Sequence, residues 1–574
     1  MKLSKKIISI LLALCFVTGG MIPVTADGET SETNVWDGTK DTDWYTADSD
    51  ATVFRIDTAE ELAGLAAIVN GEIDDVSETF SGKTIILDAD ITLYSGNAED
   101  WKTKKPTDIS KSTEYGWTPI GYTDEQHYTS SASPKTITYT VANSFQGAFD
   151  GNGHTVSGIY YSRDGFTKSD GVSTTNVAGI GLFGFANGAT IKRLRVENSY
   201  LNGNLAIGGI VGWATNTAIS DCYSDAKIKV SNLHEGDLGG YGGILGFGVG
   251  GTGVGVTVSG CWFDGEIYRD SNTYSKNTGA GSSGIIGTIS NVDNAIDSCL
   301  VTGSISGTTQ VGGVVGKCNA ISGKTTVTIN NTLMLGFVSA LRNNDATYAG
   351  EFIGIVMSNG TASMMNVYGK SDFKITLNSD NANNNTVTGK GTYVWSTNGT
   401  GKITDWAQNA TNHRKTEAEL KALVGAEGGL AVGEWAVVEG KNYPIPAYFA
   451  PAQFLGVQFA DVDGDTYNVR FVGTIDTIEG YSKVGFEILL WDGTSPEALK
   501  YDLEDATVYT TILAGTSSGI DEKISVDGKY LIALTIMGAL EEYDEYQIRT
   551  FVSDGTNKIY GKTVTMTRPD TWNQ

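Results

Sequence analysis

One short glycine-rich phrase recurs along the middle of the chain and constrains the fold more than any other feature. Each copy contains a glycine, two apolar residues and a closing glycine, and the copies span residues 180–184, 208–212, 242–246, 283–287 and 312–316. Their second residues lie 28, 34, 41 and 29 positions apart. Self-similarity at intervals of roughly 20 to 50 residues is typical of a solenoid, in which each repeat packs only against its neighbours.

The remainder of each repeat predicts strands rather than helices. Each repeat contains three short β-branched runs, separated by Gly, Asn, Asp and Ser, which are turn residues. We therefore predict that each repeat forms one coil of a parallel β-helix, with coils about 4.8 Å apart. Right-handed parallel crossovers predict a right-handed helix. We expect the glycines to allow sharp corners, through positive φ angles, and close approach of neighbouring coils.

The repeats resemble the bacterial GLUG motif, because the run from Gly181 through Leu182 and Phe183 to Gly184 matches its Gly-Leu-hydrophobic-Gly phrase. Residues 147–156 resemble the entry coil that precedes such repeats in secreted proteins of Gram-positive, clostridial-type bacteria. Similar non-catalytic coils occur in some immunoglobulin A-cleaving metallopeptidases. The resemblance covers roughly residues 50–450. It implies an exported β-helix protein, but the ligands of such proteins differ.

The chain divides into four predicted parts. Residues 1–26 have the basic start, apolar run and small-residue end of a signal peptide, and residues 27–51 form a polar leader. Residues 52–450 form the β-helix, capped by a short helix that Thr58 and Glu61 begin with a capping box and that ends at Asn70. Residues 451–574 contain spaced strand runs and Asp-Gly turns, which predict a small β-sandwich. The predicted fold class is all-β.

The charge of the chain limits its partners. Its 40 basic and 66 acidic residues give a net charge of −26. Such an acidic surface repels nucleic acid and anionic lipid. No second apolar run is long enough to span a bilayer, so we expect no membrane span in the mature chain. We predict an extracellular monomer, either secreted or associated with the cell surface.

Three cysteines occupy one position of successive coils. Cys222, Cys261 and Cys299 should therefore form an interior column. Stacked positions hold their Cβ atoms near the strand spacing of about 4.8 Å, whereas a disulfide prefers roughly 3.8 Å. We predict buried, reduced thiols, and the state of Cys318 stays open.

A search for catalytic chemistry identifies no catalytic residue. The chain has no His-Glu-x-x-His zinc motif and no Gly-x-Ser-x-Gly nucleophile elbow. The run that starts at Asp461 resembles the beginning of a calcium loop, but Val472 stands where the loop needs a glutamate. We therefore predict a hairpin turn at the run that starts at Asp461, with a weak Ca²⁺ site as the alternative. We expect no cofactor.

One outward column suggests ligand binding. Tyr223 and Trp262 lie one coil apart, with Arg195 at the same position of the coil before. Two rings that face the same way could stack on successive sugars, between the loops at residues 232–241 and 269–281. The alternative is that an inserted loop covers this column. The second candidate surface is the insertion at residues 95–146, through Trp101 and Trp117, the other predicted ligand-binding residues.

A neighbouring column is acidic. Glu197, Asp225 and Asp264 lie one coil apart, so their charges repel one another. Such a column could bind a cation such as Ca²⁺, or its members could raise one another's pKa. A solvated acidic face is the simpler interpretation.

These observations leave three functions open. We favour a non-catalytic binding or adhesin-like protein, whose partner is an extracellular glycan or a host or bacterial surface protein. A polysaccharide lyase or glycoside hydrolase is the first alternative, because the acidic column could supply the two carboxylates that glycosidase chemistry needs. A structural spacer that carries the C-terminal module is the second.

Overall fold

The computed structural model describes residues 35–567 except 75, 110–114, 123–142, 164–178, 204–205, 231–238, 250–254, 270–279, 291–292, 308–309, 320–323, 343–347, 358, 380–384, 388–401, 405–412, 462–466, 478, 492–506, 513–524, 527–528 and 538–544. The predicted signal peptide lies outside the described residues. No helix in the described part of the chain is both long and apolar enough to cross a lipid bilayer. The described residues form two compact units, one ending at Thr416 and the other beginning at Glu417, so the division falls before residue 450.

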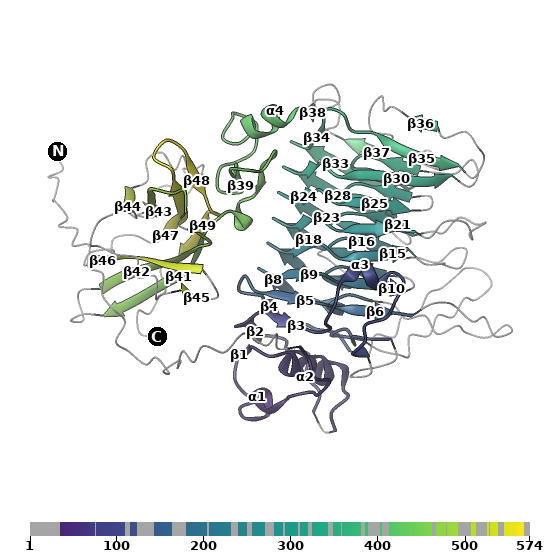
Figure 1. Ribbon diagram of the computed structural model, residues 1–574, viewed down its shortest axis with the longest axis horizontal. Coiled ribbons are helices and arrows are strands. Elements are labelled where there is room, and N and C mark those ends of the chain that lie inside the picture. Colours follow the sequence, from purple (N-terminus) through teal and green to yellow (C-terminus); the bar gives the residue numbers. More distant parts are fainter. Residues whose placement is uncertain are drawn as a thin grey trace. The chain divides into compact units, whose positions relative to one another are not determined.

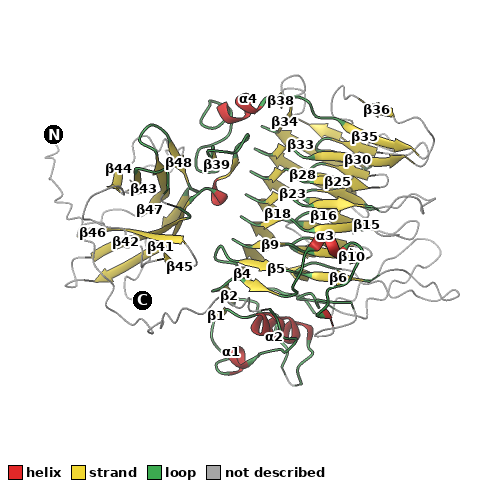
Figure 2. Cartoon of the chain, in the orientation of Figure 1, coloured by secondary structure: helices red, strands yellow, loops and turns green. Residues whose placement is uncertain are grey.

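The first unit is a parallel β-helix whose strands stack one above another, as Figures 1 and 2 show. Its strands form five sheets. Sheet 1 contains β1 (Val53–Ile56), β2 (Thr84–Leu87), β4 (Ala148–Asp150), β8 (Thr190–Lys192), β13 (Ala218–Ser220), β18 (Thr257–Ser259), β23 (Asp293–Asp297), β28 (Thr325–Asn330), β33 (Gly360–Met365) and β37 (Lys402–Thr404). Sheet 2 contains β3 (Ile91–Thr92), β5 (Thr155–Ser157), β9 (Arg195–Glu197), β14 (Tyr223–Ser224), β19 (Trp262–Phe263), β24 (Leu300–Val301), β29 (Leu333–Met334), β34 (Tyr368–Lys370) and β38 (Arg414–Lys415).

Three further sheets complete each coil. Sheet 3 contains β6 (Tyr160–Ser162), β10 (Tyr200–Gly203), β15 (Lys227–Val230), β20 (Glu266–Tyr268), β25 (Ser304–Gly307), β30 (Phe337–Arg342), β35 (Ile375–Ser379) and the antiparallel β36 (Asn385–Val387). Sheet 4 contains β11 (Ala206–Gly208), β16 (Gly240–Gly242), β21 (Gly281–Ser283), β26 (Gln310–Gly312) and β31 (Tyr348–Gly350). Sheet 5 contains β7 (Phe183–Asn187), β12 (Val211–Thr215), β17 (Leu245–Val249), β22 (Ile286–Ser290), β27 (Val315–Asn319) and β32 (Ile353–Val356).

The predicted parallel β-helix is confirmed, but each complete coil in the middle of the stack, such as β13 to β17, has five strands rather than three. The glycine phrase lies where a strand of sheet 4 ends and a strand of sheet 5 begins, as at Gly208 of β11 and Val211 of β12. None of the phrase glycines from Gly208 to Gly316 has a positive φ angle, so the predicted left-handed corner there is wrong. Left-handed residues instead occupy the corner between sheets 1 and 2, at Arg193, Asp221, Gly260, Ser298, Asn331 and Asn366.

Close approach explains the phrase glycines. A Cβ atom on Gly246 of β17 would lie 2.5 Å from the backbone nitrogen of Ile207 in β11. The equivalent atom on Gly287 would lie 2.4 Å from the nitrogen of Tyr241, and the same contact recurs at Gly316. Real Cβ atoms do not approach backbone this closely, so sheets 4 and 5 pack backbone against backbone.

Two glycines of β17 test this explanation. Gly246→Ala should lower the free energy of unfolding by about 1–3 kcal/mol, because the new methyl group overlaps backbone that cannot move aside. A Cβ atom on Gly248 would meet nothing closer than 3.4 Å, so Gly248→Ala is the matched control and should be nearly neutral. Thermal and urea unfolding of both variants measure the difference, and equal losses would contradict the steric explanation.

The N-terminal cap covers the first coil. Helix α2 (Ala59–Asn70) begins with the predicted capping box between Thr58 and Glu61 and ends at Gly71 in a left-handed conformation. The preceding residues join this cap, because Trp36 is buried and the short helix α1 (Asp43–Thr46) packs on β1 through the rings of Trp44 and Phe54. Residues from 35 onward are therefore part of the folded unit rather than a polar leader.

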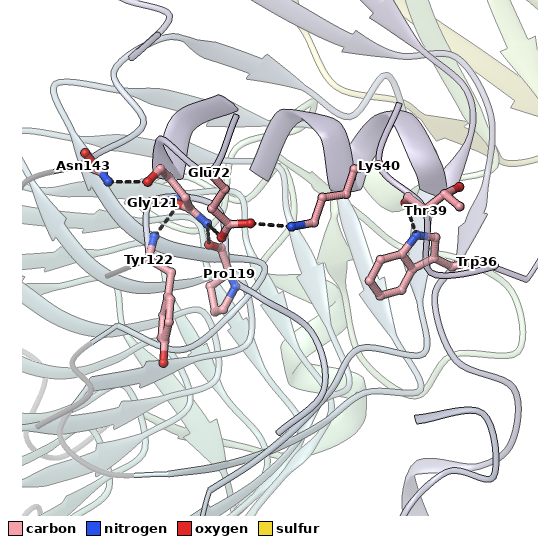
Figure 3. Close-up of polar contacts among 9 residues, drawn as sticks. Trp36, Thr39, Lys40, Glu72, Pro119, Gly121, Tyr122 and Asn143 are labelled. Atoms are coloured by element: carbon pink, nitrogen blue, oxygen red, sulfur yellow. Dashed lines mark hydrogen bonds and ion pairs between the residues drawn. The ribbon is translucent and has the colours of Figure 1, made fainter. Parts of the chain in front are cut away.

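The side chain of Asn70 replaces a missing strand at the edge of sheet 5. Its amide donates to the Pro119 carbonyl at 3.1 Å and accepts from the backbone nitrogens of Gly121 at 2.9 Å and Tyr122 at 2.7 Å, in the contacts drawn in Figure 3. Ile120 pairs with Phe183 of β7, so this segment extends sheet 5 by one strand. The cap thereby satisfies backbone groups that an open end would expose.

The interior cysteine column is confirmed. Cys222, Cys261 and Cys299 directly precede residues that pair in register on sheet 2, and all three are fully buried. The structure has free thiols at these positions and at Cys318. Burial raises the pKa of the Cys222 and Cys299 thiols well above its usual value, so these groups pack as small neutral side chains.

The second unit contains the predicted β-sandwich. It begins with α4 (Glu417–Ala422), β39 (Trp435–Ala436), β40 (Ile445–Pro446) and a 3₁₀ helix (Ala447–Phe449). One sheet contains β41 (Ala452–Asp461), β42 (Tyr467–Ile475), β46 (Lys529–Met537) and β45 (Ser525–Val526). The other contains β44 (Thr507–Ile512), β43 (Lys483–Trp491), β47 (Glu545–Ser553), β48 (Lys558–Tyr560) and β49 (Val564–Thr567). A shared core joins the two antiparallel sheets, for example through Phe454 and Phe486.

Candidate functional site

The predicted aromatic column lies on sheet 2, where Tyr223 pairs with Arg195 on one side and with Trp262 on the other. The prediction that Tyr223 and Trp262 are adjacent is confirmed. Their ring centroids are 5.3 Å apart, but the ring planes meet at 84°. The prediction that both rings face the same way is therefore wrong, and one flat ligand cannot stack on both faces at once.

Contacts within the protein occupy these side chains. Tyr223 is 9% exposed and Trp262 is 6% exposed. The Trp262 indole donates to the Thr302 hydroxyl at 2.7 Å, and the Arg195 guanidinium lies 4.3 Å from the centre of the Tyr223 ring. The column therefore stabilises the stack and leaves little ring surface for a sugar.

The loops expected beside this column arise from another part of the coil. Residues 231–238 and 270–279, which form most of the two loops, lie outside the described residues, but their described ends do not. Each loop joins sheet 3 to sheet 4, from β15 to β16 and from β20 to β21. Along each coil, a strand of sheet 3 lies between these loop ends and sheet 2, which carries Tyr223 and Trp262. The prediction that the two loops flank the aromatic column is therefore wrong.

The insertion tryptophans are core residues, so the prediction that they bind ligand is wrong. Trp101 ends the short helix α3 (Ala98–Trp101), is 5% exposed and packs edge-on against Tyr160 with centroids 5.8 Å apart. Trp117 is 1% exposed and packs against Trp36 beneath the N-terminal cap. Indole rings enclosed in this way cannot receive a sugar.

The acidic column also makes internal contacts. Glu197 accepts from Arg195 at 2.7 Å, Asp225 accepts from the backbone nitrogen of Asn198 at 2.7 Å, and Asp264 accepts from the Thr302 hydroxyl. Within the described part of the chain, no group of three or more His, Cys, Asp or Glu side chains could hold a metal ion. The metal site predicted at these three carboxylates is therefore not formed. The loop after Asp461, predicted as a weak Ca²⁺ alternative, lies outside the described residues.

One member of the acidic column titrates unusually. Burial, together with the negative charges of Glu197 and Asp264, raises the pKa of Asp225 to about 6, against the lowering effect of the hydrogen bond from Asn198. The predicted effect of neighbouring carboxylates on one another's pKa is thus present at Asp225, where it adds to the larger effect of burial. A carboxyl group that keeps its proton up to about pH 6 has the property of a general acid.

This pKa predicts a pH-dependent loss of stability. At pH values between the ordinary pKa of about 3.9 and the pKa in the folded chain, the folded chain holds a proton that the unfolded chain has released. The contribution of Asp225 to the free energy of unfolding therefore falls as the pH rises through this range. Asp225→Asn should therefore raise the free energy of unfolding at pH 7.5 by roughly 1–2 kcal/mol and change it little near pH 4. Urea unfolding at both pH values measures this effect, with Asp264→Asn, at an exposed residue one coil further on, as the control. An equal effect of Asp225→Asn at both pH values would contradict the assignment.

A second prediction concerns Trp262. Because its ring is buried and its indole nitrogen is hydrogen-bonded, Trp262→Ala should lower the free energy of unfolding by roughly 3 kcal/mol or more. The control is Met365→Ala, since Met365 is 53% exposed. Thermal unfolding distinguishes the two, and a Trp262→Ala variant as stable as its parent would assign this ring a role in binding instead.

The outer face of sheet 3 is covered over its first coils. Trp101 of α3 packs on Tyr160, and Lys102 forms an ion pair with Glu266 at 2.5 Å. Glu99 forms an ion pair with Lys227 at 2.9 Å, and the Lys102 ammonium lies 4.8 Å from the centre of the Tyr268 ring. The start of the insertion thus covers sheet 3 from β6 to β20.

The same face is open beyond Glu266, and the sequence analysis missed this surface. The next outward residue of the column is the exposed Ser304, followed by Phe337 at 68% exposure. The Lys370 ammonium lies 5.5 Å from the centre of the Phe337 ring. A usable signal was present, because Val338 occupies the inward column and its neighbour Phe337 must therefore face outward.

One comparison with known protein families agrees with the repeat architecture. The family model of the GLUG motif matches residues 203–230, which include β11 to β15. No curated protein matches the chain in sequence. A crystal structure described as a putative immunoglobulin A1 protease from Bacteroides ovatus is similar at 16% identity and a TM-score of 0.39, covering 69% of this chain and 93% of that one.

The enzymatically active domain of tailspike protein 4 from bacteriophage CBA120 is also similar. It shares 10% identity at a TM-score of 0.18, covering 90% of this chain and 68% of that chain. At these identities neither structural similarity bears on what this chain does.

Proposed function

We propose that this protein is an extracellular, non-catalytic binding protein, secreted or attached to the cell surface, that uses the β-helix to hold a glycan. The observation that carries this proposal is the open part of sheet 3, where Phe337 presents most of its ring to solvent. An aromatic face supplies apolar contact area at little entropic cost, which suits the apolar face of a sugar ring.

The regular spacing of the coils supports a polymeric ligand. Outward residues of sheet 3 recur once per coil, as Ser304 pairs with Phe337 and Ser306 with Ser339. Strand spacing of about 4.8 Å places such side chains along a straight line. A single aromatic contact gives weak binding, so useful retention depends on many copies on one cell or many sites on one polymer.

Glycoside hydrolysis is the second candidate, and Asp225 is the observation that favours it. Its pKa of about 6 suits a general acid. The hydrogen bonds of the other two carboxylates in this column favour the non-catalytic binding function over hydrolysis. Glu197 and Asp264 both accept hydrogen bonds from groups within the protein.

One experiment separates these functions. The purified protein is incubated with a panel of neutral and acidic polysaccharides, and both retained protein and released reducing ends are measured. We expect retention on at least one polysaccharide without release of reducing ends. Release that Asp225→Asn abolishes would establish hydrolysis, and neither retention nor release across the panel would favour the spacer function.

A further inference from the structure

We propose that the open face of sheet 3 selects acidic sugars, with the ring of Phe337 under the apolar face of the sugar and the ammonium groups of Lys370 and Lys374 near its carboxylate. This inference rests on the proposed glycan-binding function and adds the ligand class and the residues that recognise it.

Strand register brings the three side chains to one place. Val338 pairs with Ile305 on the coil before and with Ile375 on the coil after. Phe337 therefore lies between Ser304 and Lys374 in the outward column, and both of these neighbours are exposed. Lys370 ends β34 on sheet 2, and its ammonium group lies over the same ring, 5.5 Å from its centre.

The charge of this surface contrasts with the rest of the molecule. The whole chain carries a net charge of −26. Among the described residues, no carboxylate lies within ion-pair distance of Lys370 or Lys374, so both ammonium groups can meet a ligand. The exposed Asp372 lies between them in sequence, which leaves a local excess of one positive charge. A local positive patch attracts the carboxylate of an anionic ligand at this site, whereas the acidic surface elsewhere on the molecule repels it.

The shape and chemistry of the surface favour a sugar acid over an acidic peptide. Phe337 stands among the short hydroxyl side chains of Ser304, Ser306 and Ser339 and is 68% exposed, with the Lys370 ammonium as the cation over its ring. Hydroxyl groups donate to and accept from sugar hydroxyls, and an ammonium group forms a charge-assisted hydrogen bond with a carboxylate. An aromatic ring, neighbouring hydroxyls and a cation together match a hexuronate residue, which has an apolar face, several hydroxyls and one carboxylate.

The test compares binding to polygalacturonate with binding to dextran, a neutral polysaccharide, by affinity electrophoresis of the full chain. Phe337→Ala should weaken binding to polygalacturonate roughly tenfold, taking aromatic contact energies as a guide. The Lys370→Gln/Lys374→Gln double variant should also bind polygalacturonate several-fold more weakly and show a flatter salt dependence. The parent should bind dextran weakly, and the lysine substitutions should not change that binding.

Matched controls make the outcomes distinct. Met365→Ala removes another exposed apolar side chain, and Lys324→Gln/Lys483→Gln removes two exposed lysines elsewhere, so both should bind polygalacturonate like the parent. A parent that binds no polysaccharide would overturn the proposed function itself. Binding that Phe337→Ala leaves unchanged would overturn this site but keep the function. Equal binding of dextran and polygalacturonate, or unchanged binding after both lysine substitutions, would overturn the acidic ligand class.

Discussion

The backbone contact between sheets 4 and 5 is the constraint on which the rest of the β-helix depends. Glycines such as Gly246 and Gly287 let one strand lie directly on the backbone of another, with no side chain between them. The same glycines recur because every coil must make this contact with its neighbour. The chain can therefore turn back on itself within a few residues and still bury its apolar side chains in sheets 1, 2 and 3. A methyl group at one such position would disturb two coils at once, since the neighbouring strands belong to successive repeats.

Side chains close the stack where no further coil follows. At the N-terminal end, the amide of Asn70 satisfies backbone groups that the next strand would otherwise bind. At the other end, Glu351 occupies the phrase position that glycine holds in the preceding coils. Its buried carboxylate accepts hydrogen bonds from His413 and Arg414, each at 3.1 Å. Glycine is required where a further glycine phrase packs above, so its loss at residue 351 coincides with the last strands of sheets 4 and 5, β31 and β32.

Aromatic residues divide into those that build the stack and those that remain for binding. Trp101, Trp117, Tyr223 and Trp262 are all buried, and each packs against another ring. Phe337 differs because the insertion that covers sheet 3 ends at the coil of Glu266. Whether an outward ring is available for a ligand thus depends on how far an inserted segment reaches across the sheet. That distance sets the boundary between covered and open surface.

The repeat interval, the β-branched runs and the capping box were sufficient to predict the parallel β-helix, its N-terminal helix, the cysteine column and the sandwich. These features are local or periodic. The column of cysteines follows from the in-register stacking of the repeats alone. The sequence did not determine which outward columns stay exposed, because segments distant along the chain cover them, as Lys102 covers Glu266. It also did not determine the angle between the Tyr223 and Trp262 rings, which packing sets. Only the tertiary structure decided that the predicted aromatic site is enclosed and that Phe337 is open to solvent, since exposure depends on every segment that reaches a surface.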